Sequence, residues 1–371
     1  MTELKANKMK KQPLTFWAGK KAYEKIRRHG LSADDVQVMA GAAGGPKWLV
    51  LNRLDRAIFG NWLAARKAPL FLLGASIGAW RFAAGCQKDP VEAIARFEKA
   101  YMQQAYPDNP PPEIIDAELE RILDELLDRD GPEQILSNPA FRLSILAVRC
   151  RKMTGTDRKS RLIPGLGLAA AVNAVSRRGL GLFFERTLFY DSRQRPPFYS
   201  MNGFPIQRVA LDKNNLKAAL MASGSIPMLM SGIKNIPGAP AGMYRDGGIL
   251  DYHLNIDLQP GGEGIVLFPH YAEKLVPGWL DKQVFWRRPD FSRMDNVLMV
   301  APSADFVSRL PMGKIADRSD FYTFAGKDQQ RMDCWQQVVD QGRHLAEDFM
   351  ETVETGRIGN RLRPIWDLYR R

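Results

Sequence analysis

Hydrophobic and polar positions in the N-terminal part of the chain predict an alternation of strands and helices. Short apolar runs at residues 36–40 and 69–73 are typical of buried strands. A Gly/Ala-rich loop at 41–45 follows the first run, and apolar residues at helical spacing continue over 47–59. Small apolar residues at 76–85 suit a buried helix. Strands and helices that alternate in this way indicate a parallel α/β core.

The rest of the chain carries the same two patterns. Short apolar runs predict strands at residues 143–148, 208–211, 265–268 and 297–300. Helical spacing predicts an amphipathic helix over 115–127, a helix from Asn214 or Asn215 to Met221, and a long final helix over 327–353. The composition of residues 16–30 predicts a short basic helix that Gly30 ends.

One apolar segment, residues 163–182 (IPGLGLAAAVNAVSRRGLGL), has no single structural interpretation. Its small, Gly-rich composition is compatible with a mobile lid, an element that touches a membrane, or a core helix. We take the core helix as the default expectation.

No linker divides the 371 residues convincingly into two domains. We expect a flexible basic segment at 1–15, a single α/β domain over 16–356 and a basic tail at 357–371. The proline-rich segment 106–112 (YPDNPPP) interrupts the regular pattern of strands and helices. It begins a helical insertion, which we place at about 106–135.

Composition limits the class of protein. A hydrophobic content of 45% is enough for a sizeable core, and a charged content of 25% is ordinary for a globular protein. Cys86, Cys150 and Cys334 lie far apart without metal-binding spacing, so we expect buried free thiols and no metal. Because we find no signal-type or membrane-spanning apolar run, we expect a cytoplasmic location, with peripheral membrane contact as an extension.

The net charge of +12 points to anionic partners. Basic residues cluster near both ends of the chain and again at 149–161. Such clusters bind anionic lipid or nucleic acid, or form solvated faces. Because no nucleic-acid motif accompanies them, we expect contact with an anionic membrane and no nucleic-acid partner.

The sharpest motif is Gly74-Ala75-Ser76-Ile77-Gly78, between a predicted strand and a predicted helix. A G-x-S-x-G pentapeptide in this setting exposes the serine hydroxyl on a tight turn, and its glycines let strand and helix approach closely. Ser76 is therefore a candidate nucleophile. The alternative is an ordinary tight turn.

A glycine loop, Gly41 to Lys47, lies between an earlier predicted strand and helix. Consecutive glycines can direct backbone N–H groups toward a developing oxyanion. The spacing fits neither a phosphate loop nor a dinucleotide-binding loop. A loop that only packs a helix remains the alternative.

The third motif is Asp246-Gly247-Gly248, which taken alone is usually a turn. A serine nucleophile needs a base, however, and Asp246 is a candidate for it. The chain has four histidines, and His253 and His270 follow the serine and the aspartate in the order of some hydrolase triads. A histidine base therefore stays open on the residues alone.

These three motifs, in this order, resemble the patatin-like phospholipase family, in which a glycine-rich loop precedes G-x-S-x-G and a D-G-[GA] turn. The segment Ala219–Pro227 (ALMASGSIP) is similar to a further family segment before the aspartate. The resemblance implies a three-layer α/β/α fold with a mainly parallel central sheet and extra helices. It also implies a Ser–Asp dyad without histidine, and no metal or organic cofactor.

Carried over by position, the resemblance implies Ser76 as the nucleophile and Asp246 as the base. It gives the oxyanion-hole positions to Gly44 and Gly45, with Lys47 at the family's basic position. The glycines that shape the two turns are Gly74, Gly78, Gly247 and Gly248. The implied activity is hydrolysis of carboxylic esters of lipids or phospholipids, so the expected partner is a lipid or another acyl ester.

The chain departs from the family pattern at three places. Trp48 replaces a glycine, Pro46 lacks an N–H, and residues 249–255 lack the usual asparagine and proline. These departures keep open a catalytically silent lipid- or membrane-binding protein, and the histidines keep open a Ser-Asp-His esterase. Apolar residues near the motifs suggest an acyl pocket: Trp48, Trp80, Phe82, Ile226, Met228, Leu229 and Met230.

Overall fold

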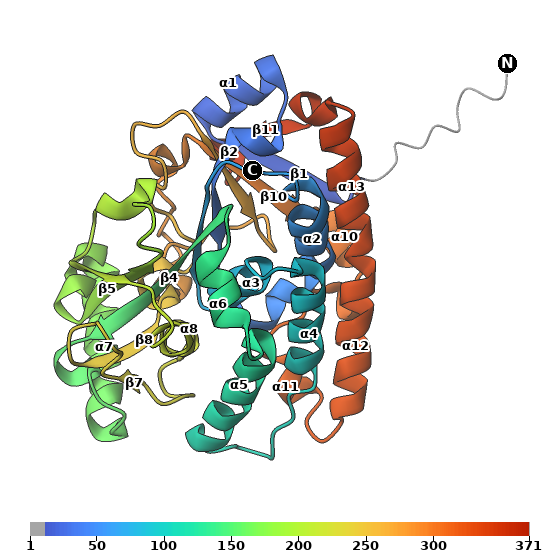
Figure 1. The fold of residues 1–371 in the computed structure, drawn as a ribbon. Coiled ribbons are helices and arrows are strands. Elements are labelled where there is room, and N and C mark those ends of the chain that lie inside the picture. Colours follow the sequence, from blue (N-terminus) through green and yellow to red (C-terminus); the bar gives the residue numbers. More distant parts are fainter. Residues whose placement is uncertain (1–11, 371) are drawn as a thin grey trace, which may run out of the picture.

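The computed structural model describes residues 12–370, which form an α/β structure around an 11-stranded sheet (Figure 1). The strand order is β11-β1-β10-β9-β2-β3-β4-β5-β6, with β8 paired to β4 and β7 paired to β8. The strands are β1 Leu14–Ala18, β2 Val36–Gly41, β3 Leu70–Ala75, β4 Phe141–Cys150, β5 Phe184–Tyr190, β6 Ile206–Ala210, β7 Ile233–Lys234, β8 Met243–Asp246, β9 Ile265–Pro269, β10 Val297–Pro302 and β11 Leu362–Pro364.

The central strands β10, β9, β2, β3 and β4 all run parallel. Strands β3, β9 and β10 are buried along their whole length, because helices cover both faces of the sheet. This arrangement confirms the predicted three-layer α/β/α class.

Helices connect and cover the strands. They are α1 Lys20–His29, α2 Asn52–Ala57, α3 Ile77–Gly85, α4 Pro90–Met102, α5 Pro112–Leu127, α6 Gly131–Ser137, α7 Lys159–Val175, α8 Leu216–Gly224, α9 Gly248–Asp251, α10 Ala304–Ser308, α11 Asp320–Thr323, α12 Asp328–Gln341 and α13 Arg343–Glu354. Figure 1 shows α2, α4, α12 and α13 on one side of the molecule and α7 on the opposite side.

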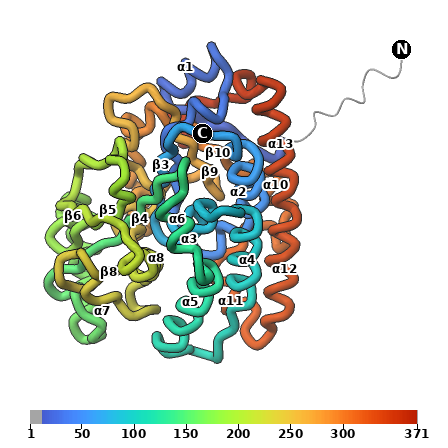
Figure 2. Tube along the Cα trace, in the orientation of Figure 1, coloured from blue at the N-terminus to red at the C-terminus, as the bar shows by residue number. Residues whose placement is uncertain are grey.

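Both ends of the described chain belong to the sheet, which differs from expectation. Leu14 and Thr15, expected in a loose segment, lie in β1, and the basic helix expected from residue 16 begins only at Lys20. The remainder of that predicted segment, residues 1–11, lies outside the described residues. The expected basic tail contains β11, which pairs in parallel with β1, so the two ends of the described chain lie side by side (Figure 1). Figure 2 shows the same path as a tube along the Cα trace.

Two helix predictions need correction. The long final helix over 327–353 is broken at Gly342 into α12 and α13. Glycine fits this position because a side chain there would lie 2.9 Å from the carbonyl oxygen of Val50. The apolar segment after residue 163 lies largely within α7, whose inner residues are buried. Its outer face is open to solvent, however, so the core-helix interpretation is wrong for that face.

Strands β3 and β8 meet end to end along one edge of β4. Ala75 of β3 pairs with Leu146, and Asp246 of β8 pairs with the next residue of β4, Ala147. Strand β5 occupies the opposite edge of β4 over the same stretch. Because β3 is parallel and β8 antiparallel to β4, their carboxyl ends face each other. The residue after Ala75 therefore lies at the level of Asp246.

The turn after β3 depends on close backbone contact. A Cβ atom at Gly78 would lie 2.1 Å from the carbonyl oxygen of Gly41, at the end of β2. A Cβ atom at Gly74 would lie 2.3 Å from the amide nitrogen of Ala79. These two glycines therefore allow α3 to begin directly against β2 and β3.

We expect Gly78→Ala to lower the free energy of unfolding by about 1–3 kcal/mol, because backbone must shift to admit the methyl group. The matched control is Gly167→Ala in α7, where a Cβ atom would meet nothing within 4 Å. That change should stabilise by about 0.5–1 kcal/mol, the usual gain of alanine over glycine in a helix. Chemical denaturation of both variants measures the difference, and equal effects would contradict the close contact at Gly78.

Candidate active site

Ser76 occupies a strained turn between β3 and α3. Its φ of 55° and ψ of −131° are rare for a residue with a side chain, as is typical of a nucleophile elbow. The Oγ of Ser223 in α8 accepts a hydrogen bond from the Ser76 amide at 2.8 Å and donates to the carbonyl of Leu146 at 2.6 Å. Ser223 thus links the strained turn to β4 through these two hydrogen bonds.

The structure brings Ser76 and Asp246 into direct contact. The Ser76 hydroxyl donates to Oδ2 of Asp246 at 2.7 Å, although 170 positions separate the two residues. The other oxygen, Oδ1, accepts from the amide of Gly248 at 2.6 Å. A side chain at Gly247 would lie 2.2 Å from the carbonyl oxygen of Leu146, so glycine is required there for Asp246 to reach the serine.

Burial gives the Asp246 carboxyl the properties of a base. The residue is only 7% exposed. Burial raises the pKa of Asp246 to about 6, while hydrogen bonds from Ser76 and Gly248 and the charges of Arg318 and Lys282 act to lower it. An ordinary aspartate is a much weaker proton acceptor near neutral pH. The environment therefore makes Asp246 a stronger base that is still ionised at neutral pH.

The glycine loop lies beside this pair. Gly44 and Gly45 line a small cavity together with Ser76 and Asp246. Gly45 has a φ of +57°, and a side chain at Gly44 would lie 2.6 Å from the ring of Tyr271. Both positions therefore favour glycine, and the loop is placed where backbone N–H groups can serve an oxyanion.

Lys47 has a different setting from the one predicted. It lines neither of the two cavities that Ser76 lines, and its Nζ lies 5.2 Å from the centre of the Tyr271 ring. Trp48 is buried and stacks on Phe97 with ring centres 4.5 Å apart. The departures from the family pattern at Pro46 and Trp48 therefore point into the protein interior rather than toward the serine.

His253 and His270 are structural neighbours of the glycine loop. His253 Nδ1 accepts from the amide of Val276 at 2.9 Å, so its Nε2 carries the proton and donates to the Tyr271 hydroxyl at 2.6 Å. Tyr271 in turn donates to the carbonyl of Ala43 at 2.7 Å. This chain of hydrogen bonds braces the loop just before Gly44.

Neither ring contacts Ser76 or Asp246. His270 uses Nδ1 to bond the carbonyl of Ala272 at 2.6 Å. Burial lowers the pKa of His270 to about 3 and holds the pKa of His253 well below its ordinary value, so both rings are neutral near pH 7. This geometry favours the dyad over the histidine-using alternative.

A largely apolar cavity of about 600 Å³ opens from Ser76. Four of the seven residues predicted for an acyl pocket line it: Trp80, Ile226, Leu229 and Met230. Trp48 and Phe82 are instead buried in the core, and Met228 lies outside the lining. Helix α5, from the predicted insertion, adds Ile115 and Leu119 to the wall, and the segment after residue 318 adds Phe321 and Tyr322.

Arg318 and Lys282 lie close enough to Asp246 for their charges to lower its pKa, and a third cation, Lys47, acts on Lys282 without lining either cavity. Arg318 lines both cavities that Ser76 lines, Lys282 lies 3.8 Å above the Tyr252 ring, and Lys47 lies over Tyr271. Within residues 12–370, none of the three forms an ion pair, although the charge of Asp317 acts on Lys47. Partial burial, together with repulsion from Lys47 and Arg318, lowers the pKa of Lys282 to about 8. The site is therefore electropositive.

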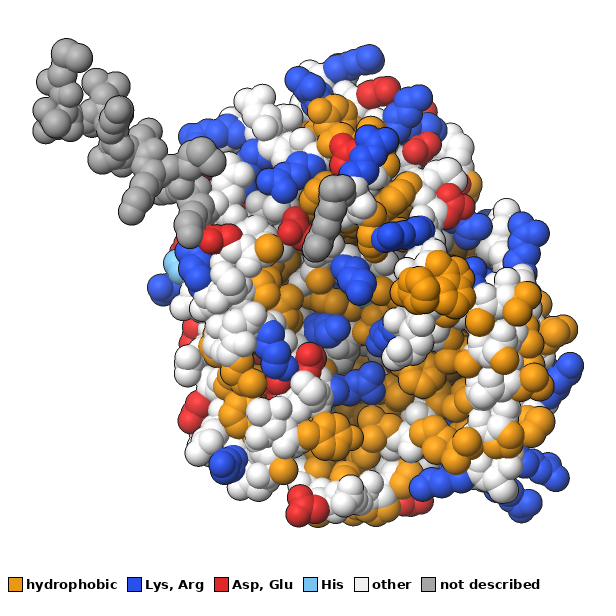
Figure 3. All heavy atoms as spheres, turned by 180° about the vertical axis from the view of Figure 1, so that it is seen from behind, with side chains coloured by type: hydrophobic (Ala, Val, Ile, Leu, Met, Phe, Trp, Pro, Cys, Tyr) orange, Lys and Arg blue, Asp and Glu red, His pale blue; other side chains and the backbone are white. Residues whose placement is uncertain are grey.

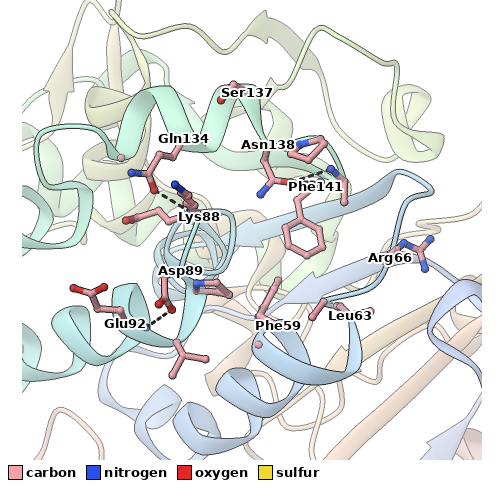
Figure 4. Close-up of a pocket in the computed structure, with 18 of the residues that line it drawn as sticks. Phe59, Leu63, Arg66, Lys88, Asp89, Glu92, Gln134, Ser137, Asn138 and Phe141 are labelled. Carbon is pink, nitrogen blue, oxygen red and sulfur yellow. Dashed lines mark hydrogen bonds between the residues drawn. The ribbon is translucent and has the colours of Figure 1, made fainter.

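A second, larger cavity of about 910 Å³ lies elsewhere in the molecule (Figure 4). Its polar groups bond one another: the amide of Lys88 donates to Gln134, and Asp89 accepts from the amide of Glu92. Phe59 and Phe141 pack edge to face in its wall. It contains none of the predicted site residues and no serine–carboxylate pair among the residues that line it.

The described part of the chain offers no metal site and no membrane span. No group of three metal-ligating side chains occurs among residues 12–370. Cys86, Cys150 and Cys334 are free thiols, of which the first two are buried. No described helix combines the length and the apolar composition needed to cross a bilayer.

Comparison with known proteins adds little to this geometry. No protein-family model and no curated protein sequence matches the chain. Among solved structures, the chain is similar to VipD from Legionella pneumophila, with 12% sequence identity and a TM-score of 0.36 over 93% of this chain and 72% of that chain. Similarity at this level carries no argument about activity, so the function must be argued from the site.

Sequence reasoning missed three residues that shape the site. Ser223 lies in the segment quoted for the family resemblance, but its bond to the Ser76 amide depends on how α8 packs. Tyr271 and Arg318 belong to no motif, and only the fold brings them to the glycine loop. Arg318 lies between Asp317 and Asp320 in the sequence, so no local pattern marks its charge as available to the site.

The raised pKa of Asp246 predicts a pH-dependent effect of Asp246→Asn on stability. Folding favours the neutral carboxyl, so stability that is present below pH 3.8 is lost as pH rises through about 6. The uncharged variant avoids this loss. We expect it to gain about 3 kcal/mol of unfolding free energy at pH 8, and progressively less as pH falls from 6 toward 3.8.

Denaturant unfolding across this pH range measures the gain. Asp333→Asn, at an exposed position of α12, controls for the chemical change itself. A gain at Asp246 that stayed constant with pH would mean that burial does not raise its pKa.

Proposed function

We propose that the protein is a serine lipid acyl hydrolase of the patatin-like type, which cleaves carboxylic esters through Ser76 and Asp246. The observation that carries the proposal is the 2.7 Å hydrogen bond from the Ser76 hydroxyl to a buried carboxylate, on a strained strand-to-helix turn beside a glycine loop. The order of the motifs along the chain supports the same assignment.

In this mechanism Ser76 Oγ attacks the ester carbonyl carbon while Asp246 Oδ2 accepts the hydroxyl proton. The N–H groups of Gly44 and Gly45 stabilise the tetrahedral oxyanion. The carbonyl then re-forms, the C–O bond to the alcohol breaks, and Asp246 returns the proton to the departing alcohol. Water attacks the resulting acyl ester of Ser76 and gives a proton to Asp246. Asp246 passes this proton to Ser76 Oγ as the Oγ–acyl bond breaks, which releases the fatty acid and regenerates the serine hydroxyl and the carboxylate.

The site chemistry favours an anionic lipid ester as substrate. The apolar cavity suits an acyl chain, and its volume lies within the usual range for small-molecule sites. The charges of Arg318 and Lys282 suit a phosphate or another anionic group near the scissile ester. Phospholipids combine both features. We place the activity in the cytoplasm, with access to lipid from a membrane surface.

A catalytically silent lipid-binding protein is the second candidate. It would keep the cavity and the cations and would have no turnover. The bracing of the glycine loop by Tyr271 and His253 argues against it, because a binding protein has no need of an ordered oxyanion site.

The dyad predicts a distinct pattern of loss among variants. Ser76→Ala and Asp246→Asn should each lower kcat for p-nitrophenyl esters by roughly 10³-fold or more, because one removes the nucleophile and the other its base. A His253→Gln/His270→Gln double variant should retain turnover within about tenfold, since neither ring touches the dyad. Wild-type kcat/KM should rise with pH through about 6, where Asp246 ionises.

Circular dichroism of each variant checks folding, and a fluorophosphonate probe checks whether Ser76 reacts. Inactivity of the folded double-histidine variant would support the histidine-using esterase instead. If the wild type neither hydrolyses esters of any chain length nor reacts with the probe, the silent lipid-binding candidate holds.

The position of Arg318 predicts selectivity for anionic substrates. Arg318→Met should lower kcat/KM for a short-chain phosphatidylglycerol by about ten- to a hundredfold, the usual range for loss of a charged contact. The diacylglycerol with the same acyl chains should be nearly unaffected. Arg129→Met, at an exposed position that lines neither of the cavities beside Ser76, is the matched control. Equal losses on both substrates would show that Arg318 supports the fold of the site rather than binding charge.

A further inference from the structure

Helix α7 presents an apolar face to solvent. From Leu162 to Val175 it contains no charged residue, so it is apolar on both sides. Helices of this kind are normally buried. Its inner side packs against the protein through Leu162 and Ala169, but on the outer side Leu168 is 52% exposed and Val175 is 90% exposed.

Both ends of this apolar face are basic. Five cations flank it and no acidic residue occurs between Asp157 and Glu185: Arg158, Lys159, Arg161, Arg177 and Arg178. Within the described chain only Arg177 has an ion-pair partner, Asp281. Cations in the first turn of a helix oppose its dipole, so Lys159 and Arg161 do not serve the stability of the helix. They are available to an external anion.

A pair of exposed aromatic residues extends this face. Phe285 is 86% exposed and Trp286 is 56% exposed. The next residue, Arg287, donates to the carbonyl of Asn173 in α7 at 2.5 Å, which ties the aromatic pair to the helix. Figure 3 shows the molecule from behind, where hydrophobic side chains gather over the side that carries α7, with Lys and Arg side chains among them and along their edge.

This face adjoins the candidate active site. Asp281 of the short helix η7 (Trp279–Gln283) accepts from Asn173 in α7, and Trp279 of the same helix lines the small cavity beside Ser76. Ile249, three residues after Asp246, belongs to the same buried cluster as Ala169 of α7. A surface that meets α7 would therefore lie on the side of the protein next to this small cavity.

We propose that the outer face of α7, together with Phe285 and Trp286, is a docking surface for an anionic lipid bilayer. Acyl chains match the apolar face, and anionic head groups match the cations at both ends. Aromatic side chains such as Trp286 favour the boundary between head groups and hydrocarbon. A second copy of the chain fits less well. If two copies packed α7 against α7, the cations at the helix ends would repel each other in both the parallel and the antiparallel orientation.

Binding to vesicles tests the docking surface independently of catalysis. The Ser76→Ala protein, which cannot hydrolyse the lipid, is sedimented with vesicles of equimolar phosphatidylcholine and phosphatidylserine, and with vesicles of phosphatidylcholine alone. We expect binding to the anionic vesicles and much weaker binding to the neutral ones. Phe285→Ser/Trp286→Ser and Leu168→Ser/Val175→Ser should each weaken the anionic binding by about tenfold or more. Arg158→Gln/Lys159→Gln/Arg161→Gln should do the same through lost charge.

The matched control is Val91→Ser/Ile114→Ser, which removes two exposed apolar side chains from α4 and α5 and should bind as the parent does. With Ser76 restored, the surface variants should keep wild-type turnover of a soluble short-chain ester. If wild-type protein hydrolysed no ester but the Ser76→Ala protein bound vesicles as expected, the proposed function would fail and the docking surface would stand.

Three results would overturn the docking proposal. One is absence of binding to anionic vesicles. Another is equal binding by the surface variants and the parent. The third is a dimer, detected by analytical ultracentrifugation, that the surface variants dissociate while vesicles are not bound, which would make a second copy the occupant of this face.

Discussion

The candidate site depends on the pairing of two strands with the same edge of β4. Strand β3 takes the first part of that edge and β8 the second, so the strands meet at their carboxyl ends. Ser76 begins the turn that leaves one strand, and Asp246 ends the other. A shift of β8 by one residue would turn the Asp246 side chain to the opposite face of the sheet. The register of a four-residue strand therefore decides whether the serine has a base.

Asp246 has the properties of a base at neutral pH only because two opposing effects on its pKa are balanced. Burial raises the pKa of Asp246, while hydrogen bonds from Ser76 and Gly248 and the nearby positive charges limit the rise. Full desolvation without these partners would keep the carboxyl protonated at neutral pH, and full hydration would make it too weak a base. The hydrogen bond from Ser76 in turn depends on the strained turn, because Ser223 must hold that turn in place for the hydroxyl to reach Oδ2.

The sequence predicted the parts of the site that are encoded locally. The elbow around Ser76, the glycine loop and the Asp246 turn each lie within a few residues, and their glycines reflect backbone contacts that any side chain would disturb. It could not predict Arg318 or Tyr271, which reach the site only through the fold. Strands β1 and β11 were missed for a related reason: both are short, and each pairs with a segment at the other end of the chain, with β11 at the edge of the sheet and β1 next to it. The order of the histidines was uninformative because Tyr271 binds His253 away from the serine.

The fold places cations that contribute to the net charge of +12 in two separate groups. One group of cations, with Arg318 and Lys282, lies near Ser76 and Asp246, where its charge lowers the pKa of Asp246 and, in the proposed mechanism, attracts an anionic substrate. Another group lies at the ends of α7, where long side chains reach solvent beside an apolar face. Screening by salt weakens the exposed group far more than the partly buried one. The two groups therefore make separable contributions, and an ionic-strength series would reduce attraction to a lipid surface before it altered the chemistry at Ser76.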